Sequence, residues 1–246
     1  MATDNRQKTP VSREKPASPD VVPERASRPQ EIEAFLNAAR TLAPVQTGVG
    51  RGRMIFALDA TMSRQPTWDT AQRLQAEMFE EAGKIGGLDI QLVYFRGFNE
   101  CRASRWVSDA RALRDLMTGI SVRGGHTQIR KVLAHARKET NREKVGVLVY
   151  VGDAMEEKVD DLAAIAGELG MLGVRIFIFQ EGRDPTVERA FRELARLSGG
   201  AYARFDVNAA GQLAELLRAA AVYAAGGLKA LAKGGAGAQR LLEQLR

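Results

Sequence analysis

Short apolar runs alternate with amphipathic segments through most of this 246-residue chain. Residues 54–58 and 145–151 are almost uninterrupted apolar runs of strand length, which is typical of strands buried on both faces of a parallel sheet. The same patterns predict further strands at 88–95, 103–108, 174–179 and 200–205, and helices at 67–85, 109–117, 128–140, 156–169, 185–197 and 209–225. This order predicts an α/β fold of three layers, in which helices cover both sides of a doubly wound, mostly parallel central sheet.

One connection is too short to join parallel strands. Only the turn around residues 97–100 separates the strand at 88–95 from the strand at 103–108. Parallel neighbours need a crossover of about a dozen residues, whereas antiparallel neighbours can be joined by a tight turn. We therefore predict one short antiparallel strand, and we place it at an edge of the sheet.

The two ends of the chain differ from its middle in composition. Residues 1–29 are rich in Pro, Ser and charged residues and nearly lack large apolar side chains, so we predict a disordered arm. Residues 30–50 are predicted to form a short amphipathic helix and a linker, the helix either packing on the domain or docking a partner. Residues 226–246 contain a glycine-rich stretch, which predicts a flexible tether. One folded domain is therefore expected at residues 51–225.

Composition and charge exclude several classes of protein. The 36 basic and 30 acidic residues give a net charge of +6, but the two signs are interspersed, which does not favour a nucleic-acid partner. No apolar run approaches the roughly 20 residues that span a bilayer, and the N-terminus lacks the apolar segment of a secretory signal. The single cysteine, Cys101, excludes an intrachain disulfide framework. We therefore expect no membrane partner and a cytoplasmic location.

Candidate chemistry follows the two most apolar strands. Asp59, Thr61 and Ser63 come directly after the first of them, and Asp153 comes after the second. If these strands are neighbours, both acids lie at the same sheet edge, where ligands bind in such folds. Carboxylate and hydroxyl oxygens suit Mg²⁺ or Mn²⁺. Taken singly, the same residues also fit turns and helix caps.

Three segments together resemble a known family. Asp59-Ala-Thr61-Met-Ser63 is similar to the Asp-x-Ser-x-Ser motif of von Willebrand factor A (vWA) domains, with Thr61 in place of the first serine. A glycine-rich loop ending at Thr127 and an aspartate after a later strand, Asp153, complete the metal-ion-dependent adhesion site (MIDAS) of that family. The resemblance covers about residues 51–225 and includes the short antiparallel edge strand of this Rossmann-like fold, which also occurs in integrin I domains and many bacterial proteins.

The resemblance implies a magnesium or manganese ion that hydroxyls bind directly and aspartates often bind through water. A carboxylate from a partner protein would complete the shell of such an ion. His126, beside the expected threonine, departs from the family pattern, and we expect it to face solvent or approach the ligand. The implied metal ligands are Asp59, Thr61, Ser63, Thr127 and Asp153, and the candidate ligand contacts are His126, Arg64 and Glu156.

These features favour recognition over catalysis. The chain has no Gly-x-Ser-x-Gly elbow and no phosphate-binding glycine loop after its first strand. Our hypothesis is therefore a non-enzymatic module that captures an acidic residue of a protein partner through Mg²⁺ or Mn²⁺. The alternative is a metal-independent scaffold subunit of a larger assembly, for example with an AAA+ ATPase. An enzyme of phosphate chemistry is the third hypothesis.

Overall fold

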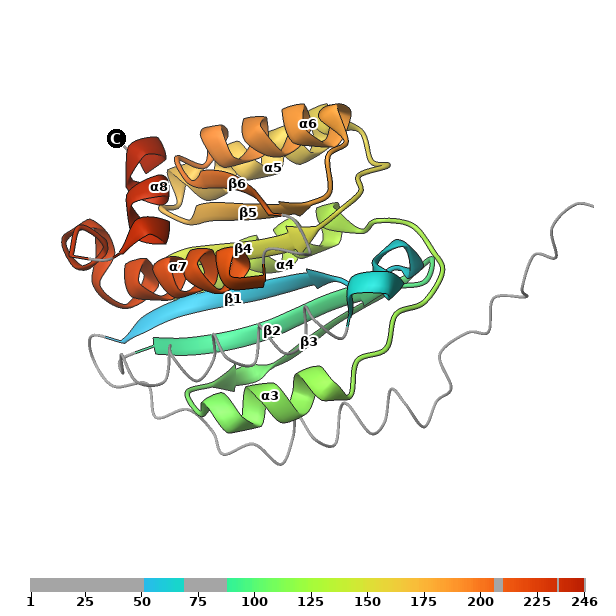
Figure 1. Cartoon of the computed structure of the whole chain (residues 1–246), viewed down its shortest axis with the longest axis horizontal. Coiled ribbons are helices and arrows are strands. Elements are labelled where there is room, and N and C mark those ends of the chain that lie inside the picture. The colour runs from blue at the N-terminus through green and yellow to red at the C-terminus, as the bar shows by residue number, and fades with distance from the viewer. Residues whose placement is uncertain (1–50, 69–87, 206–209, 234, 246) are drawn as a thin grey trace, which may run out of the picture.

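A single six-stranded sheet forms the centre of the molecule (Figure 1). The computed structural model describes residues 51–68, 88–205, 210–233 and 235–245. The strands are β1 (Gly52–Asp59), β2 (Leu88–Arg96), β3 (Glu100–Val107), β4 (Val147–Gly152), β5 (Arg175–Glu181) and β6 (Ala201–Phe205). Their order in the sheet is β3-β2-β1-β4-β5-β6, and only the β2–β3 pair is antiparallel. The strand order therefore runs outward in both directions from β1, which is the doubly wound arrangement.

Helices cover both faces of this sheet (Figure 1). They are α3 (Ala110–Thr118), α4 (Ile129–Arg142), α5 (Val159–Met171), α6 (Pro185–Leu197), α7 (Ala210–Leu231) and α8 (Ala236–Leu245), and a 3-10 helix, η1 (Met62–Thr67), follows β1. Apolar residues of α4, α5 and α6 form one core with the sheet, and those of α3, α7 and α8 form the other. The predicted three-layer α/β fold is confirmed. None of the helices in the described part of the chain is long and apolar enough to cross a bilayer.

Strand β1 supplies both cores because its side chains alternate between the two faces. Met54, Phe56 and Leu58 pack on the side of α3 and α7, and Ile55 and Ala57 pack on the side of α4, α5 and α6. All five are fully buried. Since side chains in a strand alternate with a period of two, the next residue on the side of α4 is the acid that ends β1.

The predicted hairpin is also confirmed, with different boundaries. Strand β3 starts at Glu100, three residues before the predicted strand, and a tight turn with Gly97 at φ 60° joins it to β2. Helix α5 begins at Val159, three residues after its predicted start, and the Glu156 and Glu157 carboxylates before it accept from backbone N–H groups of Thr127 and Ile129. The predicted arm at 1–29, the helix and linker at 30–50 and most of the predicted helix at 67–85 lie outside the described residues.

The C-terminal segment corrects a prediction, because it is folded where we expected a flexible tether. Helix α7 continues to Leu231 across a kink at Gly227, and α8 follows it. Leu241 is fully buried in the core, and the Gln244 side chain pairs with both the N–H and the carbonyl oxygen of Tyr202, each at 2.7 Å. Burial against the sheet outweighs the local cost of the glycines, and α8 thereby covers the exposed edge of β6.

Candidate metal centre

The three predicted loops meet at the carboxyl edge of the sheet. Strands β1 and β4 are parallel neighbours with Leu58 opposite Val151, so Asp59 and Asp153 follow adjacent strand ends. The loop before α4 joins them, because the Arg123 N–H donates to the carbonyl oxygen of Ala60 at 3.0 Å. The parallel pairing of β1 and β4 therefore places the two acids at the same edge of the sheet, as the sequence predicted.

Asp59 organises the first loop from a fully buried position. Its Oδ1 accepts a hydrogen bond from the Thr61 N–H at 2.8 Å, the geometry of an aspartate turn. The hydroxyls of Thr61 and Ser63 lie 3.1 Å apart. Thr61 is buried and Ser63 is exposed, so this pair of oxygens leads from the interior of the site to solvent.

Thr127 is held against the loop that carries Asp153. Its N–H donates to Glu156 Oε2 at 2.6 Å, and the Glu156 N–H donates to the Thr127 hydroxyl at 3.0 Å. The neighbouring carboxylate, Glu157, accepts from the N–H groups of Ile129 and Arg130 at 2.7 and 2.9 Å. These carboxylates satisfy the first turn of α4, which has no cap from its own side chains. The position of Glu157 after Asp153 suits a residue that complements a helix N-terminus, but no local signal pointed to α4, since these partners lie almost thirty residues away.

The two aspartates carry oxygens that the described residues leave without a hydrogen bond. Asp59 Oδ2 and Asp153 Oδ1 are both buried and unpartnered. Burial raises the pKa of Asp59 to about 6, hydrogen bonding by Thr61 offsets part of this rise, and the charge of Asp153 adds to it. Such acceptors need a cation or a donor, because an unsatisfied buried polar group is costly.

The donor set fits a hard divalent cation. The three loops at this sheet edge carry two carboxylates and three hydroxyls, and all five are oxygen ligands of the kind Mg²⁺ and Mn²⁺ prefer. Within the described residues, no three His, Cys, Asp or Glu side chains gather as a metal site. A metal at this edge would therefore depend on the hydroxyls of Thr61, Ser63 and Thr127.

Arg64 lies elsewhere than we predicted for a ligand contact. The side chain is fully buried, and its Nε and Nη2 lie 3.0 and 2.9 Å from Glu181 Oε2. Its Nη1 donates to the carbonyl oxygens of Asp59 and Val151 at 3.4 and 3.3 Å. Arg64 turns inward from η1 and joins the ends of β1, β4 and β5, so in this conformation it offers no surface to a ligand.

His126 and Glu156 are exposed at the rim of the site. The His126 ring packs edge-on against Phe98 at 4.9 Å, and its Nδ1 lies 3.8 Å from Glu156 Oε1. Gly125 allows this loop to approach the β2–β3 turn, since a Cβ there would lie 2.1 Å from the carbonyl oxygen of Gly97. His126 faces outward, and Thr127 keeps its contacts with the Asp153 loop.

Comparisons with known proteins agree with this architecture. No protein-family model and no curated protein matches the chain. Among solved structures, a von Willebrand factor type A protein from Catenulispora acidiphila is 16% identical, with a TM-score of 0.58 over 72% of this chain and 43% of that one. An aerotolerance-related membrane protein from Bacteroides fragilis is 18% identical, with a TM-score of 0.56 over 69% of this chain and 98% of that one.

A third similar structure is proximal thread matrix protein 1 from the mussel byssus, solved with a zinc-occupied MIDAS motif. It is 18% identical, with a TM-score of 0.59 over 70% of this chain and 46% of that one. This chain therefore matches less than half of the mussel and Catenulispora chains. The likenesses show that the chain has the fold of vWA domains, which confirms the fold that its three motifs predicted.

Proposed function

We propose that this domain binds another protein by capturing an acidic residue through a Mg²⁺ or Mn²⁺ ion. The observation that carries the proposal is the pair of buried, unpartnered oxygens on Asp59 and Asp153, side by side at the ends of β1 and β4. Two acids that share a buried place favour a bound cation over two desolvated negative charges.

Each part of the site has a distinct task in this proposal. Asp59 and Asp153 supply negative charge from the buried side of the site, and they contact the ion through water molecules, as the family resemblance implies. Thr61, Ser63 and Thr127 supply hydroxyl ligands, and the exposed side of Ser63 is where a partner would approach. Bound there, the ion supplies Lewis-acid attraction for a partner's carboxylate. The neutral hydroxyls preserve that attraction, because each added carboxylate ligand would reduce the net charge of the ion.

The mussel protein supports the proposal, since its MIDAS motif holds zinc in a similar fold. This chain has oxygen donors at all five corresponding positions, with Thr61 replacing a serine by another hydroxyl. Recognition is favoured over catalysis because the described site contains no activated nucleophile beside a base.

Metal titration tests the proposal directly. Calorimetry with Mn²⁺ and Mg²⁺ on the full chain is expected to show saturable binding at one site. Asp59→Ala should weaken that binding by about 10- to 100-fold. Asp115→Ala, which removes an exposed acid on α3, is the matched control and should bind as the wild type does. Absence of saturable binding by the wild type at millimolar metal would reject the proposal.

Capture of a partner tests the second half of the proposal. A partner bound through the ion should be released by EDTA and recovered when Mn²⁺ is restored. The Asp59→Ala variant should fail to capture it under any metal condition. Capture that is indifferent to both EDTA and Asp59→Ala would instead support the metal-independent scaffold.

A further inference from the structure

Tyr150 is a buried polar residue that the predicted metal site did not include. It stands in β4, where its neighbours are apolar, and only 2% of it is exposed. The ring stacks on Phe95 with centroids 6.3 Å apart and meets Phe191 edge-on at 5.6 Å. A phenylalanine would make the same packing contacts. The hydroxyl therefore needs a separate explanation.

The hydroxyl lies at the level of the metal centre. Ala57 is opposite Tyr150 and Leu58 is opposite Val151, so one residue further Asp59 comes opposite Gly152. Alternation along the two strands places Ala57, Asp59, Tyr150 and Gly152 on the same face of the sheet. A Cβ on Gly152 would lie 2.4 Å from the Tyr150 hydroxyl, so the phenol reaches along β4 to the position beside Asp59.

Three unpartnered buried atoms thus gather at this point. The Tyr150 hydroxyl has no hydrogen-bond partner among the described residues, and neither does Asp59 Oδ2 nor Asp153 Oδ1. Burial raises the pKa of Tyr150 well above 10, and the charges of Asp59 and Asp153 raise it further, so the hydroxyl keeps its proton. A buried donor thus lies near two buried acids whose charges act on it, and it bonds to neither of them. A water molecule between them would satisfy all three.

We propose that Tyr150 is a positioning residue of the metal site, whose hydroxyl donates to a water that Asp59 and Asp153 hold around the bound ion. The inference rests on the proposed metal-dependent function and adds Tyr150 to the residues on the buried side of the site. The phenol fixes the orientation of that water, and Gly152 leaves the space that the phenol needs. Tyr150 touches neither the partner nor the ion.

The test is Tyr150→Phe, which keeps the ring and removes only the hydroxyl. The dissociation constant for Mn²⁺, measured by calorimetry, is expected to rise about five- to tenfold, the effect of one hydrogen bond. In EDTA the variant should melt at the wild-type temperature or above it, because no bond within the protein is lost. Tyr202→Phe is the matched control, since its hydroxyl is bonded to Gln180 Oε1 at 2.8 Å. It should melt lower and bind Mn²⁺ as the wild type does.

The outcomes separate this inference from the function on which it rests. Wild-type affinity in Tyr150→Phe, with saturable binding by the wild type, overturns the inference and leaves the proposed function standing. If neither protein binds Mn²⁺, the proposed function fails and the role of Tyr150 fails with it. A melting temperature in EDTA that drops as far as in Tyr202→Phe would assign the hydroxyl to the fold, which also overturns the inference.

Discussion

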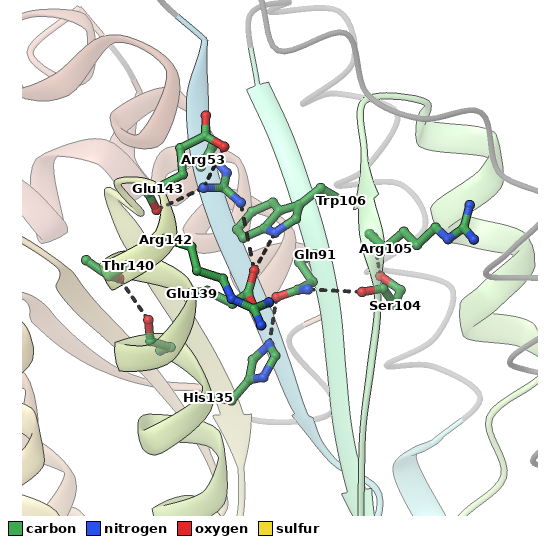
Figure 2. A network of polar contacts seen from close by, with 11 residues as sticks. Arg53, Gln91, Ser104, Arg105, Trp106, His135, Glu139, Thr140, Arg142 and Glu143 are labelled. Carbon is green, nitrogen blue, oxygen red and sulfur yellow. Dashed lines mark hydrogen bonds and ion pairs between the residues drawn. The ribbon is translucent and has the colours of Figure 1, made fainter.

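Two buried polar clusters lie at opposite ends of β1, and they differ in how many hydrogen-bond donors their carboxylates have. The candidate metal centre lies at the carboxyl end, and the Arg53 network lies at the amino end, between the sheet and α4 (Figure 2). The Arg53 network consists of Arg53, Gln91, Ser104, Trp106, His135, Glu139, Arg142 and Glu143. Both clusters bury carboxylates against the same strand, so burial alone does not distinguish them.

The Arg53 network supplies its own donors. Glu139 accepts from Trp106 Nε1 at 2.9 Å and from Arg142 at 3.0 Å, and Arg53 lies 3.9 Å away. The Arg53 guanidinium also stacks over the Trp106 ring at 3.8 Å and pairs with Glu143 at 3.1 Å. The only buried side-chain atom of the network without a hydrogen bond is a donor, Arg53 Nε. A carboxylate with this many donors stabilises the fold and needs no ion.

At the candidate metal centre, the described residues do not provide a donor for every buried acid oxygen. Arg64, a buried cation beside it, is paired with Glu181 and also donates to the carbonyl oxygens of Asp59 and Val151. Among the described residues, two acid oxygens and the Tyr150 hydroxyl at this end are buried without a hydrogen-bond partner. The difference between the clusters is that the Arg53 network satisfies its carboxylate internally, whereas the carboxyl-end cluster leaves acid oxygens that a bound cation would satisfy.

The largest expected effect is the loss of Glu139. Glu139→Ala should lower the free energy of unfolding by about 3–5 kcal/mol, because it leaves the buried Trp106 Nε1 donor without its acceptor and removes a buried carboxylate that lies 3.9 Å from Arg53. Urea unfolding measures this loss. The affinity for Mn²⁺ should be unchanged when it is measured at a urea concentration at which the variant is folded. A small loss of stability, or a parallel loss of metal affinity, would contradict the separation of the two clusters.

The next effect is a pH dependence that arises at the metal centre. The folded pKa of Asp59, about 6, lies above its ordinary value of 3.8. Between these values the folded protein keeps a proton that the unfolded chain releases, so stability falls as pH rises, by roughly 2–3 kcal/mol in all. Unfolding in EDTA from pH 4 to pH 7 should show this loss in the wild type relative to Asp59→Asn.

Adding Mn²⁺ sharpens the same experiment. At pH 7 the ion should restore stability to the wild type and not to Asp59→Asn, because the ion binds the deprotonated acid. Asp115→Asn, the exposed control on α3, should follow the wild type in both conditions. A wild-type stability that tracks Asp59→Asn at every pH would show that Asp59 carries no such penalty.

The smallest effects come from a matched pair of serines. Ser104 is buried, accepts from the Leu92 N–H at 3.0 Å and donates to the Arg105 carbonyl oxygen at 2.7 Å. Ser104→Ala should lower the free energy of unfolding by about 1–2 kcal/mol and leave Mn²⁺ affinity unchanged. The exposed Ser63 should behave in the opposite way. Ser63→Ala should change stability by under about 0.5 kcal/mol and weaken Mn²⁺ binding about tenfold. If the two variants changed stability and Mn²⁺ affinity to the same extent, the distinction between the Arg53 network and the candidate metal centre would not hold.

The role of a residue could be predicted when it depended on a local sequence pattern, and could not when its contact partners lie far away in the sequence. The approximate positions of β1 and β4, and of the acids that follow them, could be predicted because an apolar run that ends in an acid is a local pattern. The inward turn of Arg64 could not, since its partner Glu181 is more than a hundred residues away in sequence. The partners of Glu156 and Glu157 could not be predicted for the same reason, because these carboxylates bond to the backbone N–H groups of Thr127 and Ile129, almost thirty residues away.

The sequence by itself determined the order of strands and helices and brought three motif-bearing loops to one sheet edge, because hydrophobic periodicity and strand polarity are local properties. Only the tertiary structure decided that α8 folds onto β6, that the Glu139 carboxylate has donors, and that Asp59 Oδ2 has none among the described residues. These outcomes depend on contacts between residues that are far apart in the sequence, and a local sequence pattern does not determine which donors and apolar surfaces come into contact.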